Sequence, residues 1–232
     1  MTARPYVTVS CAISLDGYLD TASPPRLALS NADDFDRVDE LRSHHDAILV
    51  GARTVRLDNP RLLVRSGERQ ERRAAAGRAP SPVKATVTAT GELDPSAAFF
   101  TQGDTPKLVY CPRGDADRIR ARLGDRATVV PLGEEVRMAD LLTDLGERGL
   151  HRLLVEGGGR TLTQFLCDDL VDELQVAVAP LFVGDRRAPR FVGEGAFPWN
   201  GERRAVLAET RAVGDVVLLR YALSERFEGA GS

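Results

Sequence analysis

The sequence predicts an α/β fold, built on a mostly parallel mixed sheet that ends in an antiparallel hairpin. Strand-like and helix-like segments alternate along the chain, as they do in α/β proteins. Residues 47–50 and 152–155 are short apolar runs, typical of strands that helices cover on both faces. Residues 204–210 and 216–223 meet at Gly214-Asp215, which favours a hairpin.

The local residue types predict the order of elements in the first half of the chain. Residues 6–13 are rich in β-forming side chains and predict the first strand. Ser30 to Asp34 supply an N-cap and an acidic first turn, so a helix is expected to continue toward His45. A short helix should begin near Thr54 and end at Asn59-Pro60, because proline disfavours a helical residue before it. The other strands of this half are predicted at 47–50, 83–88 and 107–111.

The second half continues the alternation. Helices are predicted at 115–123, 138–148 and 161–167, and strands at 127–131, 152–155 and 174–179. Residues 66–82 predict a mobile surface loop with solvated arginines, and 181–201 a second irregular segment. Since no linker divides the chain, we expect one domain over 1–232, with its core at about 5–223 and a flexible tail at 224–232.

Composition and charge exclude several classes of protein. With 43% hydrophobic and 28% charged residues, the chain of 232 residues is too apolar to be disordered. Its net charge of −3 supplies no field that would attract nucleic acid or an anionic membrane. Its apolar runs fall far short of the roughly 20 residues of a membrane-spanning helix, and no leader-like segment precedes the first strand. We therefore expect a cytoplasmic protein that binds neither nucleic acid nor membrane.

The cysteines and histidines predict no metal site. Cys11, Cys111 and Cys167 lie far apart in apolar contexts, so they are expected to be reduced and buried. With no cysteine pair and only 3 histidines, the chain lacks a plausible set of zinc ligands.

Two strand ends share a design that suits a phosphate. Gly51-Ala52-Arg53-Thr54 follows one buried strand, and Gly157-Gly158-Gly159-Arg160-Thr161 follows another. Glycine lets a phosphate approach the main chain, and the N-terminus of the next helix favours negative charge. The alternative is that these are tight turns that need positive φ angles. Two such corners at corresponding strand ends predict a dinucleotide lying across the carboxyl edge of the sheet.

A second group of polar residues follows the first glycine corner. Asp58 lies at a helix end, where the helix dipole disfavours an acid, so it serves either a local cap or a ligand. Arg42, Arg61 and Arg65 have side chains that suit a phosphate. The alternative for these arginines is pairing with nearby acids at the surface.

Several motifs, in a fixed order, resemble those of a known enzyme family. They are Ser14-Leu15-Asp16-Gly17, Asp46 to Leu62, Leu154 to Gly159, Leu170 to Leu174 and Ala179 to Gly184. In this order they resemble the reductase domain of riboflavin biosynthesis, the C-terminal half of the bacterial bifunctional deaminase/reductase. The resemblance spans nearly the whole chain and implies a three-layer α/β/α fold of the dihydrofolate-reductase-like type. The zinc signatures of the deaminase half are missing, so we expect a stand-alone reductase.

The resemblance implies a reduction by NADPH in riboflavin biosynthesis. The family converts the ribosylamino group of a pyrimidine ribose phosphate, through an opened imine, to a ribitylamino group. The pyrimidine is either 5-amino-6-(5-phosphoribosylamino)uracil or its 2,5-diamino counterpart, so whether deamination comes before or after reduction stays open. By the resemblance, Asp58 and Glu156 are the catalytic acids: Asp58 hydrogen-bonds the ribose chain or assists protonation of the imine nitrogen. No nucleophile or metal is needed, because positioning supplies much of the rate.

The resemblance also implies the binding residues. Those expected to bind the substrate are Ser30, Arg42, Asp58, Leu62, Arg65 and Glu156, of which Ser30, Arg42 and Arg65 are expected at its phosphate. Those expected to bind the cofactor are Ala12, Ser14, Gly51, Arg53, Thr54, Thr88, Gly157, Gly158 and Gly159. Arg53 and Thr88 are expected near the adenosine 2′-phosphate, which would favour NADPH over NADH.

The resemblance also implies a homodimer, and apolar strands at 174–179 and 216–223 leave sheet surface for one. Departures from the family pattern concern the substrate end: Tyr18 stands where a basic residue is common, and residues 18–30 are short. Two alternatives therefore stay open. One is a related reductase that acts on a pterin or on an imine of specialised metabolism. The other is a sensor that binds NADP(H) without chemistry.

Overall fold

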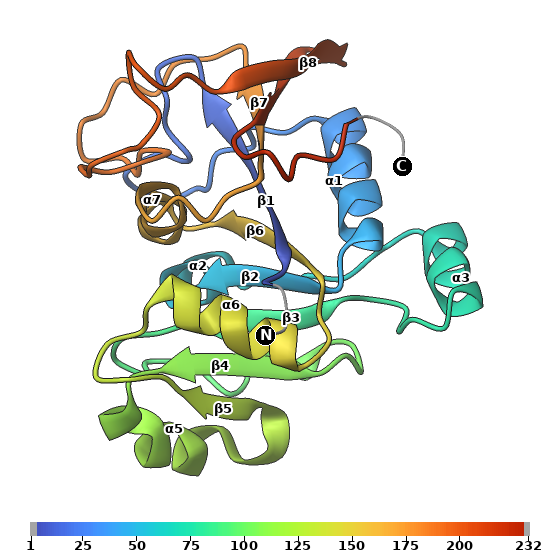
Figure 1. Cartoon of the computed structure of the whole chain (residues 1–232), viewed down its shortest axis with the longest axis vertical. Helices are drawn as coiled ribbons and strands as arrows, with labels where there is room; N and C mark the ends of the chain where they lie inside the picture. The colour runs from blue at the N-terminus through green and yellow to red at the C-terminus, as the bar shows by residue number, and fades with distance from the viewer. Residues whose placement is uncertain (1–3, 230–232) are drawn as a thin grey trace. The chain divides into compact units, whose positions relative to one another are not determined.

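The computed structural model, shown in Figure 1, describes residues 4–229, which form two compact units. Residues 4–5 and 39–154 make up the first unit, and residues 6–38 and 155–229 the second. The chain passes between the units after Pro5, inside helix α1 (Ala32–His44) and inside strand β6 (Arg152–Gly157). This division does not test whether the chain folds as one domain, which stays a prediction.

The first unit is an α/β unit with parallel strands. Its strands are β2 (Ala47–Gly51), β3 (Val83–Val87), β4 (Lys107–Cys111) and β5 (Thr128–Pro131), together with the start of β6. The pairs β2–β3, β3–β4 and β4–β5 are all parallel. Its helices are α2 (Ala52–Asp58), α3 (Gly67–Ala75), α4 (Ala98–Thr101), α5 (Ala116–Leu123) and α6 (Met138–Glu147), with short 3-10 turns at Arg113–Asp115 and Gly124–Arg126.

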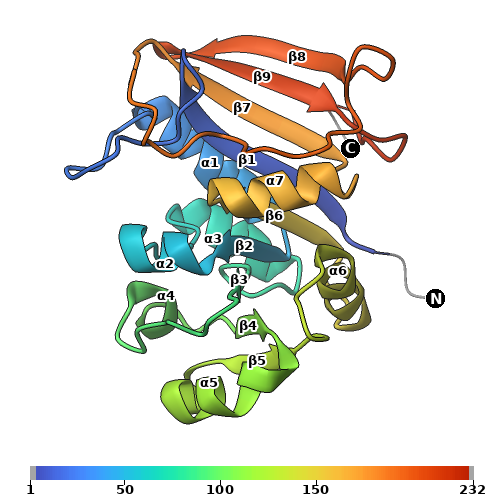
Figure 2. The ribbon, with the colours of Figure 1, turned by 90° about the vertical axis from the view of Figure 1, so that its left-hand side faces the viewer.

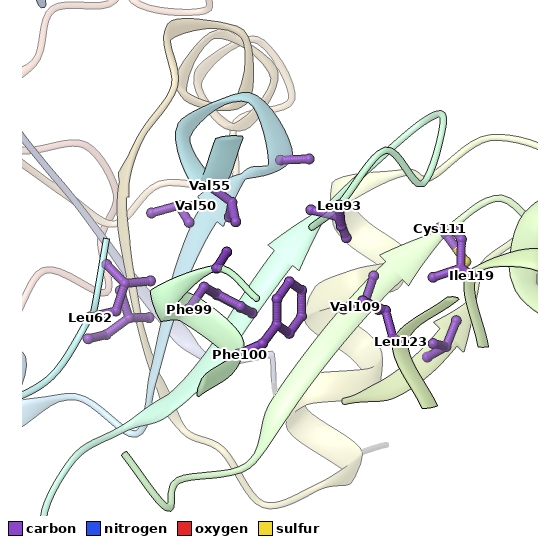
Figure 3. Packing of buried hydrophobic residues seen from close by; sticks show 14 of the residues in the cluster. Val50, Val55, Leu62, Leu93, Phe99, Phe100, Val109, Cys111, Ile119 and Leu123 are labelled. Atoms are coloured by element: carbon purple, nitrogen blue, oxygen red, sulfur yellow. The ribbon is translucent and has the colours of Figure 1, made fainter. Parts of the chain in front are cut away.

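Helices cover both faces of these parallel strands, which explains why the middle residues of each strand are buried. Alternate residues of β4 point to opposite faces. Val109 and Cys111 join a buried cluster with residues of α2, α4 and α5, which Figure 3 shows from close by. On the other face, the hydroxyl of Tyr110 donates to the carboxylate of Asp144 in α6 at 2.7 Å. Figure 2 shows α6 on the other side of these strands from α2 and α4, so this unit has three layers.

The second unit carries the antiparallel part of the sheet. Strand β1 (Tyr6–Ser14) pairs in parallel with β7 (Glu173–Ala179). Strand β9 (Val216–Ala222) runs antiparallel to β7, and β8 (Val206–Val213) antiparallel to β9, side by side in Figure 2. Helix α7 (Gly159–Cys167) follows β6. Among the described residues the nine strands have the order β5-β4-β3-β2-β6-β1-β7-β9-β8. The predicted α/β class, mixed sheet and terminal antiparallel pair are confirmed.

The prediction of a mobile loop at 66–82 is wrong for its first half, where α3 forms. Ser66 caps this helix, because its hydroxyl oxygen accepts from the main-chain N–H of Arg69 at 3.4 Å. The arginines are not simply solvated, since Arg69 pairs with Asp39 and Glu40, and Arg73 is buried. These partners lie on α1, far away in sequence, so the local composition did not reveal them.

Other expectations have mixed outcomes. The short helix α4 was not predicted. All three cysteines are free; Cys11 and Cys111 are buried as predicted, whereas Cys167 is half-buried. Within the predicted tail, Ser224 donates to the carboxylate of Asp172 at 2.6 Å, while residues 230–232 lie outside the described part of the chain, so the tail's flexibility stays a prediction. None of the helices in residues 4–229 has the length and apolar character needed to cross a membrane.

Candidate active-site residues

The first glycine corner lies at the carboxyl edge of β2 and β3. Gly51 ends β2 and pairs in register with Val87, so Thr88 follows at the same edge of the sheet. Arg53, exposed, and Thr54, half-buried, lie in the first turn of α2. The φ angle of Gly51 is −68°, which any residue adopts, so a turn that needs positive φ does not explain this glycine. The first unit thus brings four predicted cofactor residues to one edge.

Thr88 has a structural partner at this edge. Its side chain is buried, and its hydroxyl oxygen accepts from the main-chain N–H groups of Gly91 at 2.8 Å and Thr90 at 3.3 Å. These bonds hold the turn that follows β3. The predicted role of Thr88 near a 2′-phosphate stays a prediction.

The segment after α2 has unusual backbone geometry. The helix ends at Asp58, as predicted, and Asn59 follows in the left-handed region with φ 44°. The side-chain oxygen of Asn59 accepts from the main-chain N–H of Ala98 at 2.7 Å, which ties this segment to the start of α4. Leu62 is also left-handed, with φ 50°. Only three non-glycine residues of the described chain have positive φ, and two of them, Asn59 and Leu62, lie in this segment. Backbone of this kind is concentrated at functional sites.

Asp58 and Leu62 differ in exposure. Asp58 is half-buried. Leu62 is 2% exposed, and its side chain packs in the core cluster with Phe99 and Phe100 (Figure 3). A contact between Leu62 and a substrate would therefore use its main chain rather than its side chain.

Two of the three residues predicted at the phosphate, Arg42 and Arg65, lie at one short segment of the first unit, residues 63–65. The guanidinium of Arg42, on α1, donates to the carbonyl oxygen of Leu63 at 3.2 Å. The side chain of Arg65 is 59% exposed, and its Nε lies 3.6 Å from a carboxylate oxygen of Asp39. The alternative of pairing with an acid therefore also applies to Arg65. Sequence reasoning did not identify Asp39, which lies buried on α1.

In the second unit, Ala12 and Ser14 lie near the carboxyl end of β1, paired with Ala177 and Ala179 of β7. Ser14 is fully buried; its hydroxyl donates to Asp16 at 2.6 Å and accepts from the main-chain N–H of Tyr18 at 3.0 Å. The side chain of Ser14 thus holds the turn after β1, and its cofactor contact stays a prediction.

Asp16 fastens two loops of the second unit. Besides Ser14, it accepts from the main-chain N–H of Gly184 at 2.7 Å and of Val183 at 3.1 Å. The hydrogen bond from Ser14, together with those from the main chain, outweighs the opposing effect of burial and lowers the pKa of Asp16 to about 2. The carboxylate is therefore ionised at neutral pH, and it joins the turn after β1 to the segment after β7.

The second glycine corner differs from the first, because the backbone itself requires its glycines. Gly157 and Gly158 have φ angles of 151° and 68°, which side-chain-bearing residues rarely adopt. A β-carbon on Gly159 would lie 2.5 Å from the carbonyl oxygen of Arg190. At this corner the glycines are therefore explained by a tight turn that needs positive φ, and such a turn can also bind a ligand. Half-buried Glu156 precedes this corner on β6, a neighbour of β1 in the sheet.

Two other residues of the second unit bear on the predictions. Ser30 is half-buried and lies two residues before α1. Tyr18, which stands where the family often has a basic residue, is buried, and its hydroxyl accepts from Arg190 at 3.0 Å. The guanidinium of Arg190 also stacks 4.6 Å from the centre of the Tyr18 ring. A basic group therefore lies beside Tyr18 although it comes from another loop.

Solved structures of similar fold exist. A pyrimidine reductase-like protein from Corynebacterium diphtheriae is 23% identical, with a TM-score of 0.79 over 94% of this chain and 91% of that one. A bifunctional deaminase/5-amino-6-(5-phosphoribosylamino)uracil reductase from Thermotoga maritima is 22% identical, with a TM-score of 0.76. This chain spans 56% of the length of the bifunctional enzyme. At these identities the similarity establishes the fold.

Sequence relatives are closer. A 2,5-diamino-6-ribosylamino-4(3H)-pyrimidinone 5′-phosphate reductase from Archaeoglobus fulgidus is 37% identical over 187 residues, 80% of this chain and 85% of the relative. The protein of the same name from Methanothermobacter thermautotrophicus is 33% identical over 95% of this chain and 99% of its own. The model of the RibD C-terminal domain matches residues 5–219. The chain therefore belongs to the RibD C-terminal domain family.

Proposed function

We propose that this protein is an NADPH-dependent reductase of riboflavin biosynthesis. It converts the ribosylamino group of 2,5-diamino-6-ribosylamino-4(3H)-pyrimidinone 5′-phosphate to a ribitylamino group. The observation that carries this proposal is its identity of 37% and 33% to reductases of that name, which it matches over 85% and 99% of their length. The same identity favours the diamino substrate over its deaminated counterpart.

The residues at the first glycine corner fit a phosphate of NADPH. Gly51 keeps an ordinary φ of −68°, so its lack of a side chain leaves room for a ligand rather than serving a strained turn. Arg53 is exposed in the first turn of α2, where a guanidinium suits a 2′-phosphate. We assign Gly51, Arg53, Thr54 and Thr88 in the first unit, and Ala12, Ser14 and Gly157 to Gly159 in the second, to the cofactor. When bound, NADPH supplies the hydride.

The substrate residues have separate tasks. Arg42 and Arg65 bind the phosphate with charged guanidinium groups, and Ser30 adds a hydroxyl. Asp58 accepts a hydrogen bond from the ribose chain and assists protonation of the imine nitrogen. Glu156 orients the sugar against the hydride donor. These groups act by holding the reacting carbon in place and by assisting proton transfer, and positioning supplies much of the rate of such a reaction.

An assay of NADPH oxidation with purified protein tests the proposal. Turnover is expected with the diamino pyrimidine ribose phosphate, more slowly with its deaminated counterpart, and more slowly with NADH than with NADPH. No turnover with either pyrimidine would overturn the proposal. Activity toward dihydrofolate or an unrelated imine would indicate the related reductase instead, and NADPH binding without oxidation of any substrate would indicate a sensor.

We also propose that the protein works as a cytoplasmic homodimer. Strand β8 lies at one edge of the sheet, and its residues Val206 and Leu207 are 65% and 52% exposed. An exposed edge strand with apolar side chains is a template for pairing with another chain, and a second copy offers the same strand. The free cysteines suit a reducing compartment.

A further inference from the structure

A buried carboxylate on α1 holds the main chain of a predicted phosphate ligand. Asp39 is 1% exposed. One of its oxygens accepts from the main-chain N–H of Arg65 at 2.6 Å, and the other accepts from the N–H of Ser66 at 3.1 Å. Arg69 also donates to this second oxygen, at 3.0 Å. Asp39 therefore fixes the backbone at the position where the Arg65 side chain starts.

The surroundings of Asp39 keep it charged. Burial by itself would raise the pKa of Asp39, but the hydrogen bonds from the N–H groups of Arg65 and Ser66, and from Arg69, outweigh burial and lower the pKa. Burying a carboxylate is unfavourable unless it is paired in this way, so the arrangement depends on all three donors. An ionised carboxylate accepts stronger hydrogen bonds from the N–H groups of residues 65 and 66 than a neutral group would.

The same turn of α1 supports both predicted phosphate ligands. Arg42 follows Asp39 by three residues, so both side chains lie on one face of α1. Arg42 donates to the carbonyl oxygen of Leu63, two residues before the main-chain N–H that Asp39 binds. The Nε of Arg65 also lies 3.6 Å from Asp39, so the carboxylate constrains the guanidinium as well as the backbone. One helix face thus contacts both ends of the segment 63–65, from which the Arg65 side chain extends.

We propose that Asp39 is a positioning residue for recognition of the substrate's phosphate: it holds Arg65 at the spacing from Arg42 that a phosphate requires. This inference rests on the proposed function, in which Arg42 and Arg65 bind that phosphate. Asp39 touches neither substrate nor cofactor and acts through Arg65. Its effect is therefore confined to phosphorylated ligands.

The test compares the phosphorylated substrate with its dephosphorylated analogue in Asp39→Asn. The amide presents a donor to one of the N–H groups that now meet a carboxylate oxygen, so the 65–66 backbone loosens. We expect KM for the phosphorylated substrate to rise about tenfold, with kcat nearly unchanged. KM for the dephosphorylated analogue and Kd for NADPH should not change. The matched control is Glu40→Gln, because Glu40 is the next residue of α1 and pairs with Arg69, Arg72 and His44. This control should keep the wild-type preference for the phosphate.

A double substitution separates positioning from general stability. In an Arg65→Ala background, Asp39→Asn should cause no further loss of phosphate preference, because the residue through which it acts is gone. If Asp39→Asn raised KM for the phosphorylated substrate and for its dephosphorylated analogue by the same factor, or changed neither, the inference would be overturned while the proposed function stayed intact.

If the wild type turns over neither pyrimidine, the inference can still be tested by measuring the binding of ribose 5-phosphate by calorimetry. The proposed function then fails, but weaker binding by Asp39→Asn than by Glu40→Gln would still support positioning at a phosphate site. Equal binding by both variants, or no binding to the wild type, would overturn the inference as well.

Discussion

The carboxylate of Asp58 occupies an unfavourable place in its helix. It ends α2, where the last carbonyl groups carry partial negative charge, and the strained Asn59 follows it. Replacing Asp58 by asparagine should therefore not destabilise the helix, but it exchanges the proposed proton-exchanging carboxyl group for an amide that cannot take up or release a proton. We expect kcat/KM to fall by about 100-fold or more, within the range of lost acid–base assistance.

Two measurements check this prediction. Steady-state kinetics of Asp58→Asn give the loss of activity, and fluorescence titration gives its Kd for NADPH, which should remain that of the wild type. Asp117→Asn serves as the control, because Asp117 is a fully exposed acid of α5. Weakened NADPH binding by Asp58→Asn would instead place Asp58 at the cofactor.

His45 gives the fold a dependence on pH. It is buried, and its Nδ1 lies 2.7 Å from the carbonyl oxygen of Leu41. Burial lowers its pKa from 6.5 to about 4, so between these values the unfolded chain binds a proton that the folded chain does not. Stability is therefore lost as the pH falls through this window, by about 2 kcal/mol from pH 7 to pH 5.

Urea unfolding at pH 7 and pH 5 measures this loss. His45→Asn should reduce the difference between the two pH values by about 2 kcal/mol, whatever its stability at pH 7. A pH difference in His45→Asn equal to that of the wild type would contradict the assignment.

Single residues show what the sequence could and could not predict. Asp58 and Gly51 lie where the local pattern placed them, because a helix end and a strand end are local properties. Asp39 could not be predicted from the sequence, because an acidic residue on a helix is expected to be exposed unless the segment that covers it is known. The structural bonds of Ser14 and Thr88 likewise depend on turns that composition does not specify.

At the scale of elements, α3 is held by one of its arginines. Arg73 is 4% exposed and donates to the carbonyl oxygens of Ala79, Ser43 and His45 at 2.7 to 2.8 Å. Arg73→Ala would leave these buried acceptors without their donor, so we expect a loss of about 3 kcal/mol in the free energy of unfolding.

The neighbouring arginine provides the control for this prediction. The side chain of Arg72 is 53% exposed and pairs with Glu40, so Arg72→Ala should cost less than about 1 kcal/mol. Urea unfolding of the two variants at one pH compares them directly. Equal losses would mean that α3 is not anchored through Arg73.

The elements that sequence reasoning missed share a cause. Helix α3 depends on α1 for the partners of its arginines, and α4 is held at its start by Asn59 and at its end by Lys84. Lys84 is fully buried and donates to the carbonyl oxygens of Phe99 and Gln102 at 3.1 and 2.6 Å. The strands at 47–50 and 152–155, by contrast, were predictable, because an apolar run identifies a strand covered on both faces without reference to its neighbours.

At the scale of the whole molecule, the proposed dimer predicts the mass in solution. Light scattering should give twice 25.2 kDa for the wild type. Leu207→Asp places a charge on the exposed edge strand and should shift the protein toward the monomer, because a buried carboxylate without a partner opposes association. Phe35→Asp, at a residue of α1 that is 46% exposed, is the control and should remain dimeric. A monomeric wild type would contradict the proposal.

The crowded contact at Gly159 affects how substitutions at the two glycine corners are interpreted. A methyl group there would press on the main chain of residue 190, and at Gly157 it would force alanine to a φ of 151°. Weaker coenzyme affinity after either change would therefore reflect a displaced loop or a distorted turn. Gly51 has a backbone conformation that alanine tolerates. A loss of coenzyme affinity in Gly51→Ala would therefore report directly on a clash between the added methyl group and the ligand.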